Sequence, residues 1–520
     1  MYRKKTIFIL LLLCVLIIPT TRASASDVIG NNKNGIPDKG LYRDILNKLG
    51  KKPKETFTKQ EAEQIRSLNV FSNIKNIKGI KHLKNLKRLD LEGKRLKNLK
   101  GIQSLKNLEV LNISGNRIQS LKPLKNLKKL KKLDAGYNCL KNTNGLQTLK
   151  NLKELNLERN QLESVKEFKN LKNLKRINLH FNNLKSLKGF GKQKNLTTLD
   201  ITNNEIKSIK ELKNLKKLKW LNAKWNSIGG ITDLKELKNL EYLDLSMNEI
   251  TSLKGLKKQT KLTELYVNRN KLTGIKEAGH LSKLETLEAE QNDITSLQGT
   301  ETLNNLTNLN ISSNRLERLD SIQNMKKLRL LNVMDNQLKQ LDEILYVKSL
   351  TSVFADFNRI KNLPDLTALP KLDYICFGYN LINEEESRLR ANLPKAYFDK
   401  YEDSFQENFK NQNIDYSIDF KEPANPELIR TNTTRISGQI HMPAEKMELI
   451  VYEDYHDEEP RRKTHFLADV DENGCFVFEQ LDLQKFAGKK CDLSIGIGTE
   501  YSEAHKQYTG IYLHSYKLKS

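Results

Sequence analysis

The sequence predicts an α/β solenoid, a curved parallel β-sheet of fourteen stacked repeats, with a small helical cap before it and a β-sandwich after it. The first observation is an asparagine that recurs every 22 residues from Asn116 to Asn380. The second is a leucine that stands eight residues before each of these asparagines. Apolar residues then alternate in runs such as "LNL", which is the pattern of a strand with one buried face. Such units bury their apolar faces only against one another, so they must stack.

The repeat itself has the form L-x-x-L-x-L-x-x-N-x-L/I, and Lys94 takes the asparagine position in the first of the fourteen units. A fixed period of this length and spacing is the leucine-rich-repeat signature. The asparagine amide can satisfy backbone groups of the turn that lose water when repeats stack. We therefore assign residues 65–382 to the solenoid, with an atypical first repeat.

The N-terminal region divides into two predicted segments. Residues 1–25 combine Arg3, Lys4 and Lys5 with an apolar run and a small-x-small site, which predicts a secretory signal peptide. Residues 26–64 carry an apolar helical stripe after Asp38, and "TKQE" has the spacing of a capping box, so a helical cap is expected. No second apolar run has spanning length. The expected mature chain is secreted, or held non-covalently at the cell surface.

Two segments follow the repeats. Residues 383–424 are polar and partly helical in pattern, and we assign them to a capping or linker segment. Residues 425–520 alternate strand-like runs with turn signals, which suits a β-sandwich. In this domain "CFVFEQL" places Cys475 outward and "CDLSIGI" places Cys491 inward, so a disulfide between them is not expected. The sequence "DVDENG" after Ala468 is interpreted as a β-turn rather than a calcium loop.

The cap sequence "IPDKGLYRDILNKLGKKPKETFTKQEAEQI" and units such as "NLKELNLERNQLESVKEF" resemble the internalin family of secreted bacterial leucine-rich-repeat proteins. The resemblance covers residues 35–382. It implies a solenoid whose concave strand face binds protein or glycan ligands, often on host cells, and an immunoglobulin-like domain after the repeats. The chain ends in "LHSYKLKS" without a sortase-type motif, so release or retention through charge is expected.

The candidate ligand site follows from numbering each repeat from its asparagine as zero. Positions −5 and −3 point into the core, so −6, −4 and −2 face solvent, and −1 borders them. Both tryptophans of the chain lie at such positions of one repeat. The predicted ligand-binding residues are Phe181, Trp220, Trp225, Tyr242, Met247, Tyr266, Glu264 and Arg269. A second candidate patch comprises Leu330, Met334, Phe354, Phe357, Tyr374 and Tyr379.

Charge separates the two faces of the predicted solenoid. The whole chain carries +26, yet positions −6, −4, −2 and −1 hold twelve acidic and six basic residues. A concave nucleic-acid site would have the opposite sign, so nucleic acid is not an expected partner. The excess lysine falls on the return side of each repeat, in segments such as "LKNLK".

No pattern of a catalytic centre, cofactor or metal site occurs in the sequence, which contains neither G-x-S-x-G nor H-E-x-x-H. The sequence thus favours an exported, non-enzymatic recognition or adhesion protein that binds a protein through its concave face. The alternative is a wall- or glycan-associated scaffold whose basic convex face holds anionic polymers. High salt should weaken the second kind of binding far more than the first.

Overall fold

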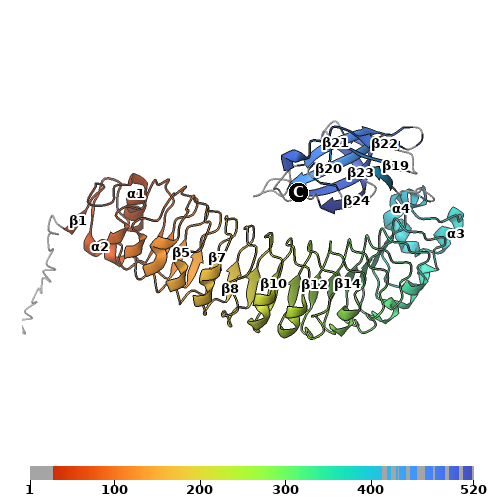
Figure 1. Ribbon diagram of the computed structural model, residues 1–520, viewed down its shortest axis with the longest axis horizontal. Coiled ribbons are helices and arrows are strands. Elements are labelled where there is room, and N and C mark those ends of the chain that lie inside the picture. The colour runs from red at the N-terminus through yellow and green to blue at the C-terminus, as the bar shows by residue number, and fades with distance from the viewer. Residues whose placement is uncertain are drawn as a thin grey trace, which may run out of the picture. The chain divides into compact units, whose positions relative to one another are not determined.

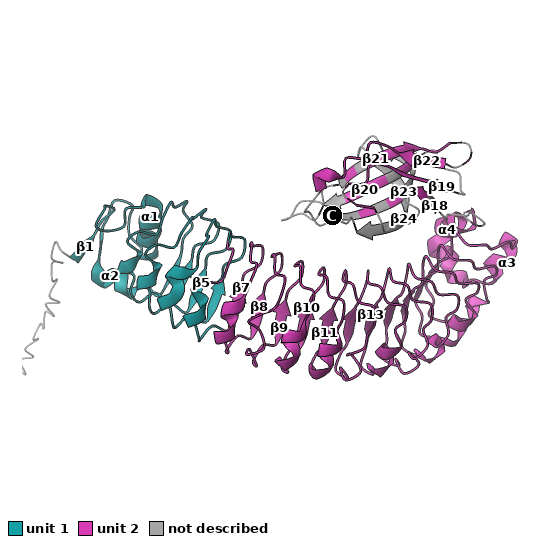
Figure 2. Cartoon of the chain, viewed as in Figure 1, with its two compact units in different colours: residues 1–139, 144–152 teal, residues 140–143, 153–520 magenta. Residues whose placement is uncertain are grey.

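The structure is a computed structural model that describes residues 27–410 and, beyond them, residues 412, 418–422, 429–430, 432–440, 446–453, 463–471, 473, 475–486, 491–502 and 507–517. The predicted signal peptide, residues 1–25, lies outside the described residues. Two compact units are distinguished (Figure 2). Unit 1 comprises residues 1–139 and 144–152, and unit 2 comprises residues 140–143 and 153–520.

Fifteen three-residue strands, β3 to β17, form the solenoid (Figure 1). Unit 1 contains β3 (Ser67–Asn69), β4 (Arg88–Asp90), β5 (Val110–Asn112) and β6 (Lys132–Asp134). Unit 2 contains β7 (Glu154–Asn156), β8 (Arg176–Asn178), β9 (Thr198–Asp200), β10 (Trp220–Asn222), β11 (Tyr242–Asp244), β12 (Glu264–Tyr266), β13 (Thr286–Glu288), β14 (Asn308–Asn310), β15 (Leu330–Asn332), β16 (Ser352–Phe354) and β17 (Tyr374–Cys376). Within each unit, successive strands pair in parallel. Trp220 thus lies beside Tyr242, one repeat of 22 residues further on.

These strands confirm the predicted leucine-rich-repeat solenoid, and they add one strand that the sequence pattern missed. Strand β3 belongs to a unit whose marker position is Ser72 instead of asparagine. Ser72 is buried, and its amide and hydroxyl both donate to the carboxylate of Asp44 at 2.8 and 2.7 Å. In an inner repeat the amide of the marker residue donates to a backbone carbonyl of the next repeat, as that of Asn226 does to Met247, so the carboxylate from the cap takes the place of that carbonyl.

The return segments of most repeats contain short 3₁₀ helices. In unit 1 these are η2 (Ile80–His82), η3 (Ile102–Ser104), η4 (Lys122–Asn126) and η5 (Leu146–Thr148). In unit 2 they are η6 (Lys166–Asn170), η7 (Lys210–Asn214), η8 (Thr232–Glu236), η9 (Lys276–His280), η10 (Ile322–Asn324), η11 (Asp342–Tyr346) and η12 (Leu366–Ala368). Each contributes at least one buried apolar residue, such as Leu212 of η7, to the core between strands and return segments.

The marker asparagines hold each repeat to the one before it. Asn226 is buried, and its Oδ1 accepts a hydrogen bond from the amide of Ile206 at 3.0 Å. Its Nδ2 donates to the carbonyl oxygens of Ile201, at 3.0 Å, and Ala223, at 3.1 Å. The same arrangement recurs at 22-residue intervals, for example at Asn248. One side chain thus satisfies buried backbone groups of two neighbouring repeats, as the pattern predicts.

The N-terminal cap in unit 1 contains α1 (Lys39–Lys48), α2 (Lys59–Gln64) and the antiparallel pair β1 (Val28–Ile29) and β2 (Phe57–Thr58). Asp38 caps α1, because one oxygen of its carboxylate accepts hydrogen bonds from the amides of Gly40 and Leu41. The other oxygen accepts from the amide of Lys75, which follows β3. The capping box predicted from "TKQE" is confirmed at the start of α2.

Two helices close the last repeat of unit 2: α3 (Glu386–Ala391) and α4 (Lys395–Lys410). The buried side chain of Asn408 in α4 accepts hydrogen bonds from the amides of Phe377 and Gly378 at 3.1 and 2.8 Å. In an inner repeat, the equivalent amide of Ala355 donates to the carbonyl oxygen of Cys376 in the next strand. Asn408 therefore replaces the missing neighbour.

The C-terminal strands form two antiparallel sheets with one apolar core. One sheet contains β18 (Ile418–Glu422), β19 (Ile436–Ile440) and β22 (Cys475–Phe478). The other contains β21 (Lys463–Asp469), β20 (Lys446–Glu453), β23 (Cys491–Ser502) and β24 (Gln507–Lys517), and η14 (Gln484–Phe486) precedes β23. Phe476 and Phe478 are buried whereas Cys475 is half-buried and a free thiol, which confirms the predicted alternation. The side chain of Cys491 lies outside the described residues.

Candidate functional site

The strand face of unit 2 comprises the outward residues at −6, −4 and −2 of each repeat together with residue −1. Position −1 has a backbone conformation that sequence reasoning missed, because every residue in this column from Gly93 to Tyr379 has a positive φ. The non-glycine members of this column are Tyr137, Arg159, Phe181, Asn203, Trp225, Met247, Arg269, Gln291, Ser313, Asp335, Phe357 and Tyr379, with φ from 47° to 57°. Gly93 and Gly115 hold the position in the earliest repeats. Left-handed backbone favours glycine and asparagine, so a bulky residue there is unfavourable for folding.

Three aromatic rings lie in contact across neighbouring strands β10, β11 and β12. The rings of Trp220 and Tyr242 are stacked, with centroids 5.0 Å apart and planes inclined by 14°. The ring of Tyr242 contacts that of Tyr266 at 5.4 Å, with planes at 39°. All three side chains are half-buried, whereas the inward neighbour Leu221 is fully buried. The sequence placed these aromatics on the outward face, and the structure adds that they form one continuous strip.

Carboxylates surround this aromatic strip, which we define as Trp220, Tyr242 and Tyr266. Burial, followed by the neighbouring carboxylate of Asp244, raises the pKa of Tyr242 above its ordinary value. Burial and a hydrogen bond to Glu264 raise the pKa of Tyr266 to about 12. Burial also raises the pKa of Asp244 itself. The strip therefore combines apolar surface with local negative charge.

The remaining predicted residues of the first patch lie at its margins. The guanidinium of Arg159 lies 4.4 Å from the centre of the Phe181 ring, and the centre of the His180 ring lies 4.3 Å from it. Phe181 and Trp225 are half-buried at position −1. The expectation of an exposed Met247 is wrong, because this side chain is only 6% exposed. Its flexible, unbranched chain can fold back into a gap that a rigid ring cannot enter.

The second predicted patch is partly covered by the helices that close unit 2. The ring of Tyr374 contacts that of Phe354 at 5.6 Å and that of Tyr401 in α4 at 4.9 Å. Phe357 and Tyr379 stack at 4.4 Å along position −1. Leu330 and Met334 are half-buried one repeat earlier. Because Tyr401 of α4 contacts Tyr374, this part of the patch serves the packing of the cap.

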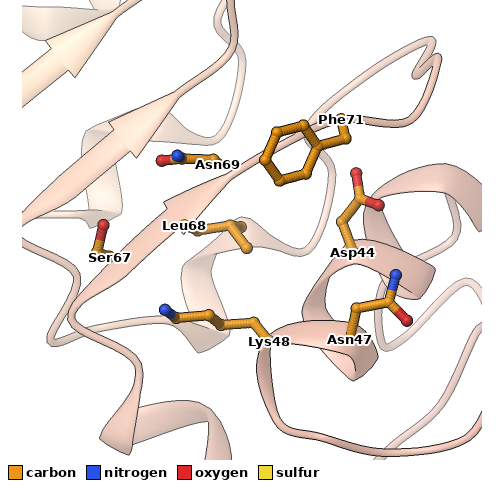
Figure 3. Close-up of a pocket in the computed structure, with 7 residues that line it drawn as sticks. All are labelled: Asp44, Asn47, Lys48, Ser67, Leu68, Asn69 and Phe71. Carbon is orange, nitrogen blue, oxygen red and sulfur yellow. The ribbon is translucent and has the colours of Figure 1, made fainter.

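A hollow of about 280 Å³ lies in unit 1 between α1 and β3 (Figure 3). It is lined by Asp44, Asn47, Lys48, Ser67, Leu68, Asn69 and Phe71. The ring of Phe71 is 81% exposed, and sequence reasoning missed it because it follows a strand of the atypical first unit. Tyr137, at position −1 in unit 1, is likewise exposed, at 38%. Among the described residues there is no cluster of potential metal ligands and no helix that could cross a membrane.

Stacked 22-residue units and an asparagine ladder define a leucine-rich-repeat protein. The family described as leucine rich repeats, in two copies, matches residues 106–150, 150–192 and 172–214. A leucine-rich-repeat protein of Leptospira interrogans is 30% identical, with a TM-score of 0.55, over 65% of this chain and 96% of that one. The chain therefore belongs to the leucine-rich-repeat family, and it is an internalin-like bacterial member.

The internalin InlF of Listeria monocytogenes supports that placement, with 29% identity and a TM-score of 0.58 over 68% of this chain and 99% of that one. The plant peptide hormone receptor RGFR1, solved in complex with RGF2, shares the fold alone. Its identity is 21% and its TM-score 0.52, over 63% of this chain and 61% of that one. No curated protein matches the chain.

Proposed function

We propose that this chain is an exported recognition protein, non-enzymatic and without a cofactor, that binds a protein ligand through the strand face of unit 2. The carrying observation is the contact of Trp220, Tyr242 and Tyr266 across three successive strands. Apolar rings with a polar tip carry much of the energy of protein interfaces. RGFR1, which shares the fold alone, is a peptide hormone receptor solved in complex with RGF2, so a leucine-rich-repeat fold can bind a ligand of this kind.

Position −1 adds a second line of support for this site. Phe181 and Trp225 adopt left-handed backbone, although Gly115 and Asn203 show that residues suited to it occur in the same column. Folding alone gives no reason to place large rings there, because the backbone cost is of the order of 1–2 kcal/mol. A ligand contact at the edge of the strip would offset that cost.

The test uses the fact that both tryptophans of the chain lie at this site. Candidate secreted or surface proteins are titrated while tryptophan emission and acrylamide quenching are followed, and Kd is then measured for the double variant Trp220→Ala/Trp225→Ala. We expect at least a tenfold loss of affinity, since interface hot spots cost about 2 kcal/mol each. Asn308→Ala, on the same face three strands beyond Tyr242, is the matched control. Unchanged binding by the double variant would remove the proposal.

The alternative function is a scaffold that holds an anionic wall polymer or glycan by the basic return side, with the aromatic strip stacking sugars. Such binding through lysines would collapse at high ionic strength, whereas binding centred on the aromatic strip would lose far less. The aromatic strip favours the protein ligand, and the two surfaces are composed of different residues. Host-cell adhesion belongs to the same proposal and would follow from the identity of the ligand.

A further inference from the structure

The return face of unit 2 carries a row of lysines in register. Ten residues before the marker asparagine, four successive repeats hold an exposed lysine, and we name these residues the lysine ladder: Lys172, Lys194, Lys216 and Lys238. In unit 1 the same position is lysine in four units: Lys84, Lys106, Lys128 and Lys150. The ladder thus repeats with the period of the fold, in the turn that joins each return segment to the following strand.

Some lysines of the repeats donate to partners within the described part of the protein, whereas the ammonium groups of the lysine ladder do not. Lys217 and Lys261, one position further along, donate from Nζ to the side chains of Asn195 and Asn239 at 3.1 and 2.8 Å. Lys219 forms an ion pair with a glutamate of the next repeat at 2.8 Å. Among the described residues, none of the four ladder ammonium groups has a hydrogen bond or an ion pair. The solenoid therefore contains lysines that serve its own packing and lysines that do not.

A row of like charges in register is unfavourable for folding. Neighbouring strands are about 4.8 Å apart, which is well within the distance over which charges interact at physiological salt. Further exposed lysines lie in two adjoining columns: Lys166, Lys169, Lys188, Lys210, Lys213, Lys235, Lys254 and Lys257. Acidic side chains in the 3₁₀ helices, such as Glu211 of η7 and Asp233 of η8, are fewer. Repulsion along the ladder is a cost that a bound polyanion would relieve.

The fold itself does not require lysine at this position. The next three repeats carry Thr260, Ser282 and Asn304 in the same column with the same strand pairing. The arginines of residues 153–275 all lie on the strand face, so the return face presents ammonium groups alone. An ammonium is a point charge without the planar fork that matches a carboxylate, and it pairs well with phosphate oxygens from any direction.

We propose that the lysine ladder of unit 2 binds a linear phosphate polymer, with phosphates of one chain contacting successive repeats. This inference gives a ligand class and a residue set to the return face, and it does not rest on protein binding by the strand face. A protein with both surfaces could be held by a polymer while its strand face stays open to a ligand.

The test compares two variants of equal charge. The ladder variant is Lys172→Ser/Lys194→Ser/Lys216→Ser/Lys238→Ser, with serine chosen because Ser282 occupies this column naturally. The control variant replaces four lysines whose Nζ donates to an asparagine, namely Lys129, Lys217, Lys261 and Lys327, by serine. Binding of inorganic polyphosphate is measured by titration calorimetry between 50 and 200 mM salt, and circular dichroism melts verify folding.

For the native protein, four phosphate contacts should lower the affinity about 50-fold across this salt range, by analogy with single-stranded polyanions. The ladder variant should lose most of that salt dependence and at least about tenfold in affinity at 50 mM salt. The control variant should remain within about threefold of the native protein. Equal losses in both variants would show that net charge alone is responsible and would overturn the proposal. Tighter binding of single-stranded DNA of the same phosphate count would also overturn it, in favour of a nucleic acid.

Discussion

The asparagine ladder allows a quantitative prediction at Asn226. Replacement by alanine removes the acceptor for the amide of Ile206 and the donor to the carbonyl oxygen of Ile201. Asn226 is 5% exposed and both isoleucines are fully buried, so water cannot restore these hydrogen bonds without opening the repeat. An orphaned buried backbone group costs about 1–3 kcal/mol, so we expect the free energy of unfolding to fall by about 4 kcal/mol.

The assay is urea unfolding followed by tryptophan emission. Trp220 and Trp225 precede Asn226 in the same repeat, so the signal reports the perturbed repeat directly. The control is Asn222→Ala, an asparagine of the same repeat that is half-buried on the strand face and accepts only a local bond from the amide of Lys224. That variant should change stability by less than about 1 kcal/mol. If Asn226→Ala costs no more than Asn222→Ala, the ladder does not stabilise the stack as we argue.

Three further predictions follow from single side chains. Trp225→Asn should leave the free energy of unfolding in urea unchanged or raise it by up to about 1 kcal/mol, because Asn203 shows that asparagine suits the left-handed backbone at this position. A loss above about 2 kcal/mol would show that Trp225 stabilises the fold. Burial raises the pKa of Asp356 from 3.8 to about 6, so its ionisation should lower stability as pH rises from 4 to 7. Asp356→Asn keeps an acceptor for the amide of Gly378 and should raise stability at pH 7 by about 1–3 kcal/mol, but not at pH 4; equal effects at both pH values would contradict this. Caesium should quench the two tryptophans more than iodide, because carboxylates such as Asp244 surround the strip, and the reverse order would contradict the local negative charge.

The sequence predicted the features that depend on period and alternation. The 22-residue asparagines, the buried leucines and the capping box at Thr58 are visible because each role needs one residue type at one spacing. The unit of β3 escaped notice because Ser72 replaces the asparagine and its amide donates to Asp44, 28 residues earlier. A partner supplied from another element leaves no trace in the repeat pattern.

The site was predicted in part, for reasons that differ between positions. Alternation along the strands placed Trp220 and Tyr242 on the outward face correctly, since that direction is set by the backbone. The burial of Met247 could not be foreseen, because it depends on the rotamer of a flexible side chain. The left-handed backbone at position −1 did leave a trace in the sequence, because Gly93, Gly115 and Asn203, which suit it, occupy that position in three repeats. The other repeats carry residues of many types there, so the preference was not recognised.

The closure of the last repeat by Asn408 has a consequence for how the length of such a protein can change. In the last repeat, the side chain of Asn408 binds the backbone amides of Phe377 and Gly378, which every repeat offers at the equivalent positions. The cap therefore recognises the end of a stack and is indifferent to the number of units before it. Removal or duplication of one whole 22-residue unit should preserve a closed, folded array, whereas a change of 21 residues would misalign every marker asparagine beyond it. The chain can thus be lengthened or shortened in fixed steps, and its binding surface with it, without redesign of either end.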